Sequence, residues 1–119
     1  MNKSHIQILK EIKEEREKFF ENYLDYALKI KNQAEKILKE AKVIVFGSIV
    51  KGDWHALNSD IDILVVSESI PEEWEKLRLI KHEIKSVLPP FHPFQIHLAT
   101  TKEYENFYKK FIKEDFTTV

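Results

Sequence analysis

Apolar residues recur at every third or fourth position through the first 42 residues, a segment without glycine or proline. This period predicts an amphipathic helix over residues 5–40, with Ser4 and Gln7 as a capping box at its start. The pattern permits one bent helix or two consecutive helices, with Asn22 as the weakest point. Because the apolar stripe is wide, we expect it to pack on a sheet; a seam for a partner helix or coiled coil is the alternative. The stripe comprises Ile8/Leu9, Ile12, Phe19/Phe20, Tyr23/Leu24, Ala27, Ile30, Ala34, Ile37/Leu38 and Ala41.

Short β-branched runs and further helical periods alternate through the rest of the chain. Two apolar runs, residues 42–46 and residues 59–66, are typical of strands, and a short helical turn follows the first of them after Gly47. The helical period then returns until Pro89 and Pro90 stop it. The later elements are a helix over residues 72–88, a strand over residues 94–99 and a last helix capped by Thr100 or Thr101.

This order of elements predicts the fold class. It indicates an α/β (α+β) fold in which helices cover a small mixed β-sheet, with a long N-terminal helical segment. At 119 residues the chain is long enough for one compact domain and too short for two. We therefore expect a single domain over residues 1–119, composed of a helical segment, residues 1–42, and a core, residues 43–119.

The composition disfavours several classes of protein. The 19 basic and 20 acidic residues nearly cancel, and only Arg16 and Arg78 are arginines, so nucleic acid is disfavoured as a partner. Without cysteine, the chain cannot form disulfides or thiolate metal sites. The amino terminus is too charged for a signal-peptide core, and no apolar run approaches the ~18 residues of a membrane span. We expect a cytoplasmic protein that does not enter a membrane.

Both glycines of the chain, Gly47 and Gly52, lie in residues 43–66, where we expect the chemistry. A strand that runs into Gly47 and Ser48 and continues as a helical turn directs backbone amides and the positive end of a helix dipole at one spot. Gly47 would let a phosphate approach the backbone, Ser48 would offer a hydroxyl, and Lys51 would add positive charge. The segment therefore predicts an anion site.

Asp60 and Asp62 stand two residues apart on the second predicted strand, so their carboxylates share a face opposite Ile61, Ile63 and Val65. Carboxylates this close repel one another unless a cation lies between them. Magnesium is held by one or two carboxylates together with substrate phosphates and water. The alternative is a polar edge-strand face bonded to neighbouring amides. If the two strands are neighbours, the predicted anion site and the acid pair share one cleft, which indicates a nucleoside triphosphate (NTP) bound with Mg²⁺ or Mn²⁺. The G-x-x-x-x-G-K-[ST] sequence of a P-loop is absent.

The arrangement G-S-x-x-x-G followed by S-D-x-D, over residues 47–52 and 59–62, closely resembles the signature of the minimal nucleotidyltransferases of the DNA polymerase beta superfamily. The resemblance implies the polymerase beta-like fold. It also implies transfer of a nucleoside monophosphate from an NTP, by default ATP, to an acceptor hydroxyl with release of pyrophosphate. The implied roles are triphosphate binding by Gly47 and Ser48, metal binding by Asp60 and Asp62, and support of the loop or of a phosphate by Ser59.

The same family commonly supplies a third carboxylate from a later strand, which binds the catalytic metal and helps to deprotonate the acceptor. Gln95 stands at the corresponding place on the predicted strand 94–99 and shares a face with His97. Gln95 can offer a neutral carbonyl ligand but brings no charge and cannot act as a base. His97 could be the base or a metal ligand, or a hydrogen-bonded polar residue with neither role. Glu103 and Glu105 are weaker candidates.

Two functions are open at this stage. The first is a metal-dependent nucleotidyltransferase. The second is a catalytically weak NTP-binding or antitoxin-like module that acts by binding a partner, and Gln95 favours it. Minimal members resemble the antitoxin halves of toxin–antitoxin pairs, so the resemblance implies a helical HEPN-type protein as that partner. The motifs leave no second domain to enclose an acceptor, so a partner protein or the mate in a homodimer would complete the acceptor site.

The aromatic residues near the motifs have structural interpretations beside the functional ones. Trp54 and His55 could contact the base or the acceptor, or Trp54 could simply anchor the loop. Four rings at helical spacing are predicted to be core residues and not a platform for stacking a base: Tyr104, Phe107, Tyr108 and Phe111.

Overall fold

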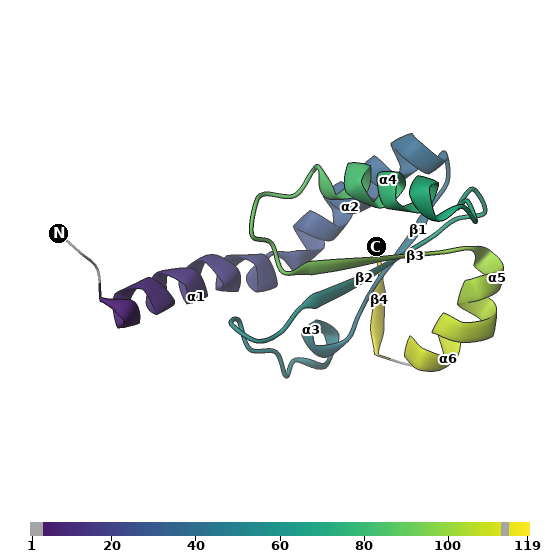
Figure 1. The fold of residues 1–119 in the computed structure, drawn as a ribbon. Coiled ribbons are helices and arrows are strands. Elements are labelled where there is room, and N and C mark those ends of the chain that lie inside the picture. Colours follow the sequence, from purple (N-terminus) through teal and green to yellow (C-terminus); the bar gives the residue numbers. More distant parts are fainter. Residues whose placement is uncertain (1–3, 113–114) are drawn as a thin grey trace.

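The computed structural model, which describes residues 4–112 and 115–119, contains a mixed sheet of four strands in the order β3-β2-β1-β4 (Figure 1). β2 and β3 run parallel, and β1 is antiparallel to both of its neighbours. The expected small mixed sheet is confirmed. The short strand β4 was not predicted, because three residues are too few to show an alternating pattern. The strands are β1 (Lys42–Phe46), β2 (Ile61–Val66), β3 (Phe94–Ala99) and β4 (Phe116–Thr118).

Helices cover both faces of the sheet (Figure 1). α2 and α4 lie on one face, and a continuous C-terminal helical segment, α5 to α6, lies on the other. None of the described helices is long and apolar enough to cross a membrane. The helices are α1 (His5–Glu21), α2 (Tyr23–Leu38), α3 (Ser48–Lys51), α4 (Trp74–Lys85), α5 (Thr101–Glu103), the π-helix η1 (Tyr104–Tyr108) and α6 (Lys109–Ile112).

The N-terminal segment forms two helices, one of the two arrangements that the sequence allowed. α1 begins with the predicted capping box, in which Gln7 N donates to Ser4 Oγ at 3.2 Å and Ser4 N donates to Gln7 Oε1 at 3.1 Å. Asn22 interrupts the helix with φ −114° and ψ 25°, and α2 begins at the next residue. The stripe of α2 packs on the sheet as expected. α1, in contrast, extends beyond the sheet and buries only Phe19 and Phe20 near its end (Figure 1).

The two faces of the sheet carry different cores. On the first face, strand residues such as Ile63 pack against α2 and α4, with Ile30 and Ile84 also fully buried. The second face buries Ile44 and Leu64 in one cluster with Ile112 of α6. Burial of each such side chain contributes about 1.5–3 kcal/mol. At the edge where β2 and β3 begin, the second face instead carries polar side chains that are half-buried or exposed.

Candidate active site

The end of β1 meets the beginnings of β2 and β3 at one edge of the sheet. Phe46 of β1 pairs with Asp62 of β2, and Asp62 pairs with Gln95 of β3. Because residues that pair across strands project from the same face, these three side chains form one row. His97, two residues further along β3, lies on that face as predicted. Ile63 projects from the opposite face and is fully buried, also as predicted.

The turn after β1 approaches the carboxylate of Asp62 closely. Gly47 has φ 90° and ψ −156°, and a Cβ atom placed on it would lie 2.7 Å from Asp62 Oδ2. Only glycine combines this backbone conformation with so little space for a side chain. The glycine turn and the acid therefore belong to one site, although a helix and a loop separate them in the sequence.

α3 continues directly from this turn. The first hydrogen bond of the helix runs from Val50 N to Gly47 O at 3.1 Å, so the amide of Ser48 lies ahead of it. Gly52 ends the helix in the left-handed conformation with φ 82°. The Ser48 residue is half-buried, and Lys51, one turn further on, is exposed. Backbone amides, a hydroxyl and a lysine thus follow the glycine in order.

Asp60 lies in the loop before β2 and not in the strand, which begins at Ile61. The predicted strand over residues 59–66 starts too early because the loop forms hydrogen bonds of its own. Ser59 N donates to His55 O at 2.8 Å, and His55 N donates to Ser59 Oγ at 2.8 Å. The Ser59 hydroxyl therefore closes the loop, and the Asp60 residue that follows it is exposed.

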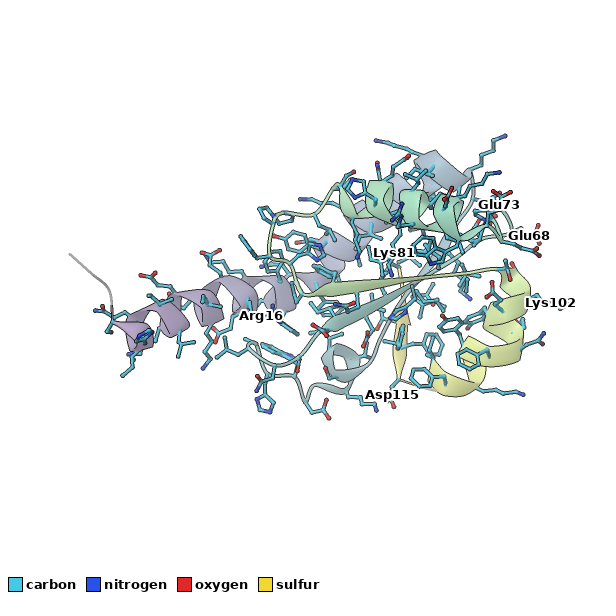
Figure 2. The ribbon with its side chains drawn as sticks, viewed as in Figure 1. Arg16, Glu68, Glu73, Lys81, Lys102 and Asp115 are labelled. Atoms are coloured by element: carbon cyan, nitrogen blue, oxygen red, sulfur yellow. The ribbon has the colours of Figure 1, made fainter. Side chains whose placement is uncertain are left out.

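α1 holds this loop from outside the motif. Arg16 Nη2 donates to Ser59 O at 2.8 Å, and Arg16 Nε donates to Ala56 O; Figure 2 labels Arg16 on α1. Phe20 stacks on Trp54 with ring centroids 4.6 Å apart and planes inclined by 12°. Trp54 therefore anchors the loop, one of the two roles that the sequence allowed. No local pattern indicates this role of Arg16, because its partners lie 40 and 43 residues further along the chain.

The sheet register brings two of the predicted site residues into contact. Asp62 Oδ1 lies 3.5 Å from His97 Nε2, and both side chains are partly exposed. The contact is an ion pair when the imidazole is protonated. Gln95, the neighbour of Asp62 on β3, is exposed. An acid, a histidine and an amide thus lie on the same face of the sheet, at the edge where β2 and β3 begin.

Two acids of the C-terminal helical segment have local partners. Thr100 caps α5: Glu103 N donates to Thr100 Oγ1 at 3.1 Å, and Thr100 N donates to Glu103 Oε1 at 3.0 Å. Glu105 pairs with Lys109 Nζ at 3.2 Å. Both carboxylates, which the sequence offered as weaker site candidates, are therefore engaged within their own helical segment.

An aromatic pocket of about 310 Å³ includes Asp62 in its wall. The prediction that the rings of the C-terminal segment are core residues is wrong for Phe107 and Phe111, which are 63% and 69% exposed. The helical spacing misled because η1 is a π-helix, whose wider turn rotates the following side chains relative to an α-helix. The residues that line this aromatic pocket are Phe46, Asp62, His97, Phe107, Tyr108 and Phe111.

The donors at this edge fit a divalent cation that binds together with a substrate. Asp60, Asp62 and the side-chain carbonyl of Gln95 offer hard oxygen atoms, the type of ligand that Mg²⁺ and Mn²⁺ prefer. Within residues 4–112 and 115–119, no group of three or more histidine, cysteine, aspartate or glutamate side chains is placed to hold a metal. In sites with one or two carboxylates, substrate phosphates and water complete the coordination of Mg²⁺. The residues therefore suit a cation that arrives with a nucleotide.

The fold and the site together define a nucleotidyltransferase-type domain. The family model for the nucleotidyltransferase domain matches residues 27–118, and the chain therefore belongs to this family. α1 and the first residues of α2 precede the matched part of the chain. A search of curated protein sequences finds no significant match.

A comparison with solved structures supports the fold of this family through one of two similar chains. One crystal structure, of a protein provisionally assigned as a nucleotidyltransferase, has 26% sequence identity and a TM-score of 0.62, and the likeness covers 82% of this chain and 98% of that chain. A second such protein, from Sulfolobus solfataricus, has 22% identity and a TM-score of 0.44 over 80% and 83% of the two chains. The first comparison confirms the nucleotidyltransferase fold, and the second is too distant to add to it.

Proposed function

We propose that the protein is an enzyme that transfers a nucleoside monophosphate from an Mg²⁺–NTP complex to an acceptor hydroxyl, with release of pyrophosphate. The observation that carries this proposal is the close approach of Gly47 to Asp62, because it joins an anion-binding turn to a metal-binding acid. ATP is the default donor, and Mn²⁺ could replace Mg²⁺. Family membership supports nucleotidyl transfer in general, and the donor, metal and acceptor class are our proposal.

In this mechanism the turn and helix that begin at Gly47 bind the triphosphate through backbone amides, the Ser48 hydroxyl and the Lys51 ammonium. Asp60 and Asp62 would hold the divalent cation, which when bound neutralises phosphate charge and helps to align the reacting oxygens. The Arg16 and Ser59 hydrogen bonds keep the loop before Asp60 in place. Most of the catalytic effect then comes from positioning.

The transfer forms a bond between the acceptor oxygen and the α-phosphorus, and it breaks the bond from that phosphorus to the bridging oxygen of the leaving pyrophosphate. The acceptor hydroxyl also loses its proton. His97 is the proposed base, because its Nε2 lies 3.5 Å from Asp62 Oδ1, beside the proposed metal. Gln95 cannot accept the proton and adds no negative charge, so we expect slow turnover.

Incubation with α-labelled ATP and Mg²⁺ or Mn²⁺ tests this proposal. We expect metal-dependent pyrophosphate release and label transfer, both lost in the Asp60→Asn/Asp62→Asn double variant. Asp25→Asn is the matched control and should retain both, because Asp25 is an exposed residue in the first turn of α2. Calorimetric titration with a non-transferable ATP analogue shows whether the loss lies in binding or in chemistry. A wild-type chain that neither binds the analogue nor releases pyrophosphate would refute the proposal.

A second candidate function is a partner-binding module with weak or no catalysis. α1 exposes Ile8, Leu9 and Ile12, and a groove of about 850 Å³ lies between α1 and the segment that carries Phe91, which is 93% exposed. Contiguous exposed apolar surface of this kind is typical of interaction sites. The partner would be a helical HEPN-type protein, as in a toxin–antitoxin pair, or a second copy of this chain.

Two measurements separate these partners. Sedimentation of the purified chain detects a homodimer, and co-expression with the product of a neighbouring gene detects a different protein. Ile12→Glu on the exposed face of α1 should abolish either association and leave ATP binding unchanged. An association that survives this substitution would show that the interface lies elsewhere.

A further inference from the structure

The aromatic pocket has features that packing alone does not require. Phe107 and Phe111 leave most of their surface exposed, although burying it would stabilise the fold. Phe107 and Tyr108 belong to η1, a rare π-helix, and turns of this type frequently occur at functional sites. The half-buried Asp62 forms part of the same wall. Exposed rings, a π-helix and an acid in one pocket together indicate a ligand site.

The rings of the pocket meet edge to face. Phe46, which is buried, crosses Phe111 at 84° with ring centroids 6.3 Å apart. Phe107 crosses Tyr108 at 90° with centroids 5.2 Å apart. The His97 ring lies 5.8 Å from Phe46 and 6.5 Å from Tyr108. A flat heteroaromatic ring suits such a set of side chains, because it can combine stacking with edge contacts.

The size and polarity of the pocket suit a single ring system. Its volume of about 310 Å³ lies at the lower end of the roughly 300–1,000 Å³ that is common for ligand pockets. The Tyr108 phenol is neutral at neutral pH and can donate a hydrogen bond; burial, together with the Glu103 carboxylate, raises its pKa. His97 provides a second polar edge. A nucleobase has flat apolar faces and polar edges, and the pocket therefore matches it in both respects.

The pocket adjoins the proposed phosphate site. Phe46 is the residue before Gly47, and Asp62 both lines the pocket and lies against Gly47. A ligand whose anionic end lies at Gly47 and Ser48 can therefore place an attached ring in the pocket. An apolar side chain of a partner protein could also contact the rings, but it would not account for the anion site beside them. We propose that the aromatic pocket binds the base of the donor nucleoside triphosphate, an inference that rests on the proposed function.

Calorimetry on the full chain can separate the base from the phosphates, because Mg²⁺–tripolyphosphate has the anionic tail of Mg²⁺–ATP and no base. In Phe111→Ala we expect the Kd for ATP to rise about 5- to 150-fold, the range for loss of one base–aromatic stack, while the Kd for tripolyphosphate changes less than about twofold. Phe107→Ala repeats the test at a second exposed ring. Phe91→Ala is the matched control and should change neither Kd, because Phe91 is an exposed ring outside the pocket.

Each other outcome has a defined meaning. Unchanged ATP affinity in both variants, with tripolyphosphate still bound, would overturn the base assignment and leave the proposed function standing. Equal weakening of ATP and tripolyphosphate would also overturn it, because a contact to the base cannot affect a ligand without one. Loss of a protein partner with unchanged ATP affinity would overturn it in favour of a docking surface. If the wild-type chain binds neither ligand, the proposed function and this inference both fail.

Discussion

Gly47 and Asp62 exclude a side chain from the space between them: a Cβ atom at position 47 would lie 2.7 Å from Asp62 Oδ2. The atom that it would meet is the end of a carboxylate, which can rotate, so a methyl group there would displace the acid more readily than the backbone. The absence of a side chain at Gly47 therefore leaves room for the Asp62 carboxylate and keeps the backbone open to a phosphate. Gly52 differs in this respect, because no atom lies within 4 Å of a Cβ placed on it.

Gly47→Ala should reduce nucleotidyl transfer by about 100-fold or more, because misplacement of a reacting group by roughly 1 Å has an effect of this size. Gly52→Ala is the control for a positive φ without the clash: at φ 82° and ψ 9° Gly52 lies in the left-handed region, whereas Gly47, at φ 90° and ψ −156°, lies in a region that is essentially restricted to glycine. Gly52→Ala should lose about 1–2 kcal/mol of unfolding free energy, measured in urea, and Gly47→Ala should lose more. Equal transfer rates in the two variants would contradict the dependence of Asp62 on Gly47.

Arg16→Gln should loosen the loop that carries Asp60. The substitution removes the guanidinium from the carbonyls of Ala56, a buried residue, and Ser59, at a cost of about 1–3 kcal/mol. We expect faster amide hydrogen exchange over residues 55–60 and a higher Mg²⁺ concentration for half-maximal transfer.

The other arginine provides the control for this prediction. Arg78 is exposed on α4 and lies over the Trp74 ring at 4.9 Å, so Arg78→Gln should leave both measurements unchanged. Arg16→Lys should recover only part of the loss, because an ammonium lacks the planar fork that reaches two carbonyls. Exchange in the loop that stays at the wild-type rate in Arg16→Gln would show that Arg16 does not hold it.

Gln95→Glu should raise the transfer rate, by roughly tenfold or more, and lower the Mg²⁺ requirement. Gln95 pairs with Asp62 in the parallel register, so a glutamate there would add a third carboxylate to the site. Without metal, the new charge should lower the melting temperature, since neighbouring carboxylates repel. Gln95→Met, similar in length and uncharged, should show neither effect. Initial rates and melting curves with and without Mg²⁺ check both parts, and an unaltered rate would mean that the missing charge does not limit turnover.

We expect protonation of His92 to lower the unfolding free energy of the protein as the pH falls. Its Nδ1 accepts a hydrogen bond from Phe94 N at 3.1 Å, and burial, together with the nearby Lys85, lowers the pKa of its imidazole. The folded pKa therefore lies below the unfolded value of about 6.5, so the unfolded chain binds the proton first as the pH falls. The stability that neutral His92 contributes is present above about pH 6.5 and decreases between the two pKa values. Because the ring is partly exposed, we expect a change of about 0.5 kcal/mol or less.

Urea unfolding at about pH 7.5 and about pH 5 measures this change. His92→Asn keeps a side-chain acceptor and removes the titrating group, so its unfolding free energy should depend less on pH than that of the wild-type chain. His82→Asn, at an exposed position of α4, should resemble the wild type. The same pH dependence in all three chains would exclude His92 as the source.

Local patterns predicted the parts of the fold that depend on neighbouring residues. The cap at Ser4 and the cap at Thr100 rest on hydrogen bonds to residues three positions away, so the residue types alone indicate them. The break at Asn22 was the weakest point of a helical period. The common face of Gln95 and His97 follows from the two-residue period of a strand. The catalytic and binding roles of these side chains stay predictions.

The same local patterns gave wrong predictions where the backbone departs from a regular α-helix or strand. The π-helix η1 changed the direction of the rings, so Phe107 and Phe111 are exposed where an α-helical period predicted core. The strand that carries Asp62 was predicted to begin too early, because the loop before it satisfies its own backbone hydrogen bonds. Both differences lie beside the candidate site.

The sequence by itself determined which residues have the chemistry for phosphate and metal, because residue type and short spacing carry that information: a glycine-serine turn and an acid pair. Only the tertiary structure decided that Gly47 lies against Asp62, that Arg16 of α1 holds the loop of Ser59, and that an aromatic pocket adjoins Asp62. These relationships join elements that are distant in the chain. They depend on how strands pair and helices pack, and no local period encodes them.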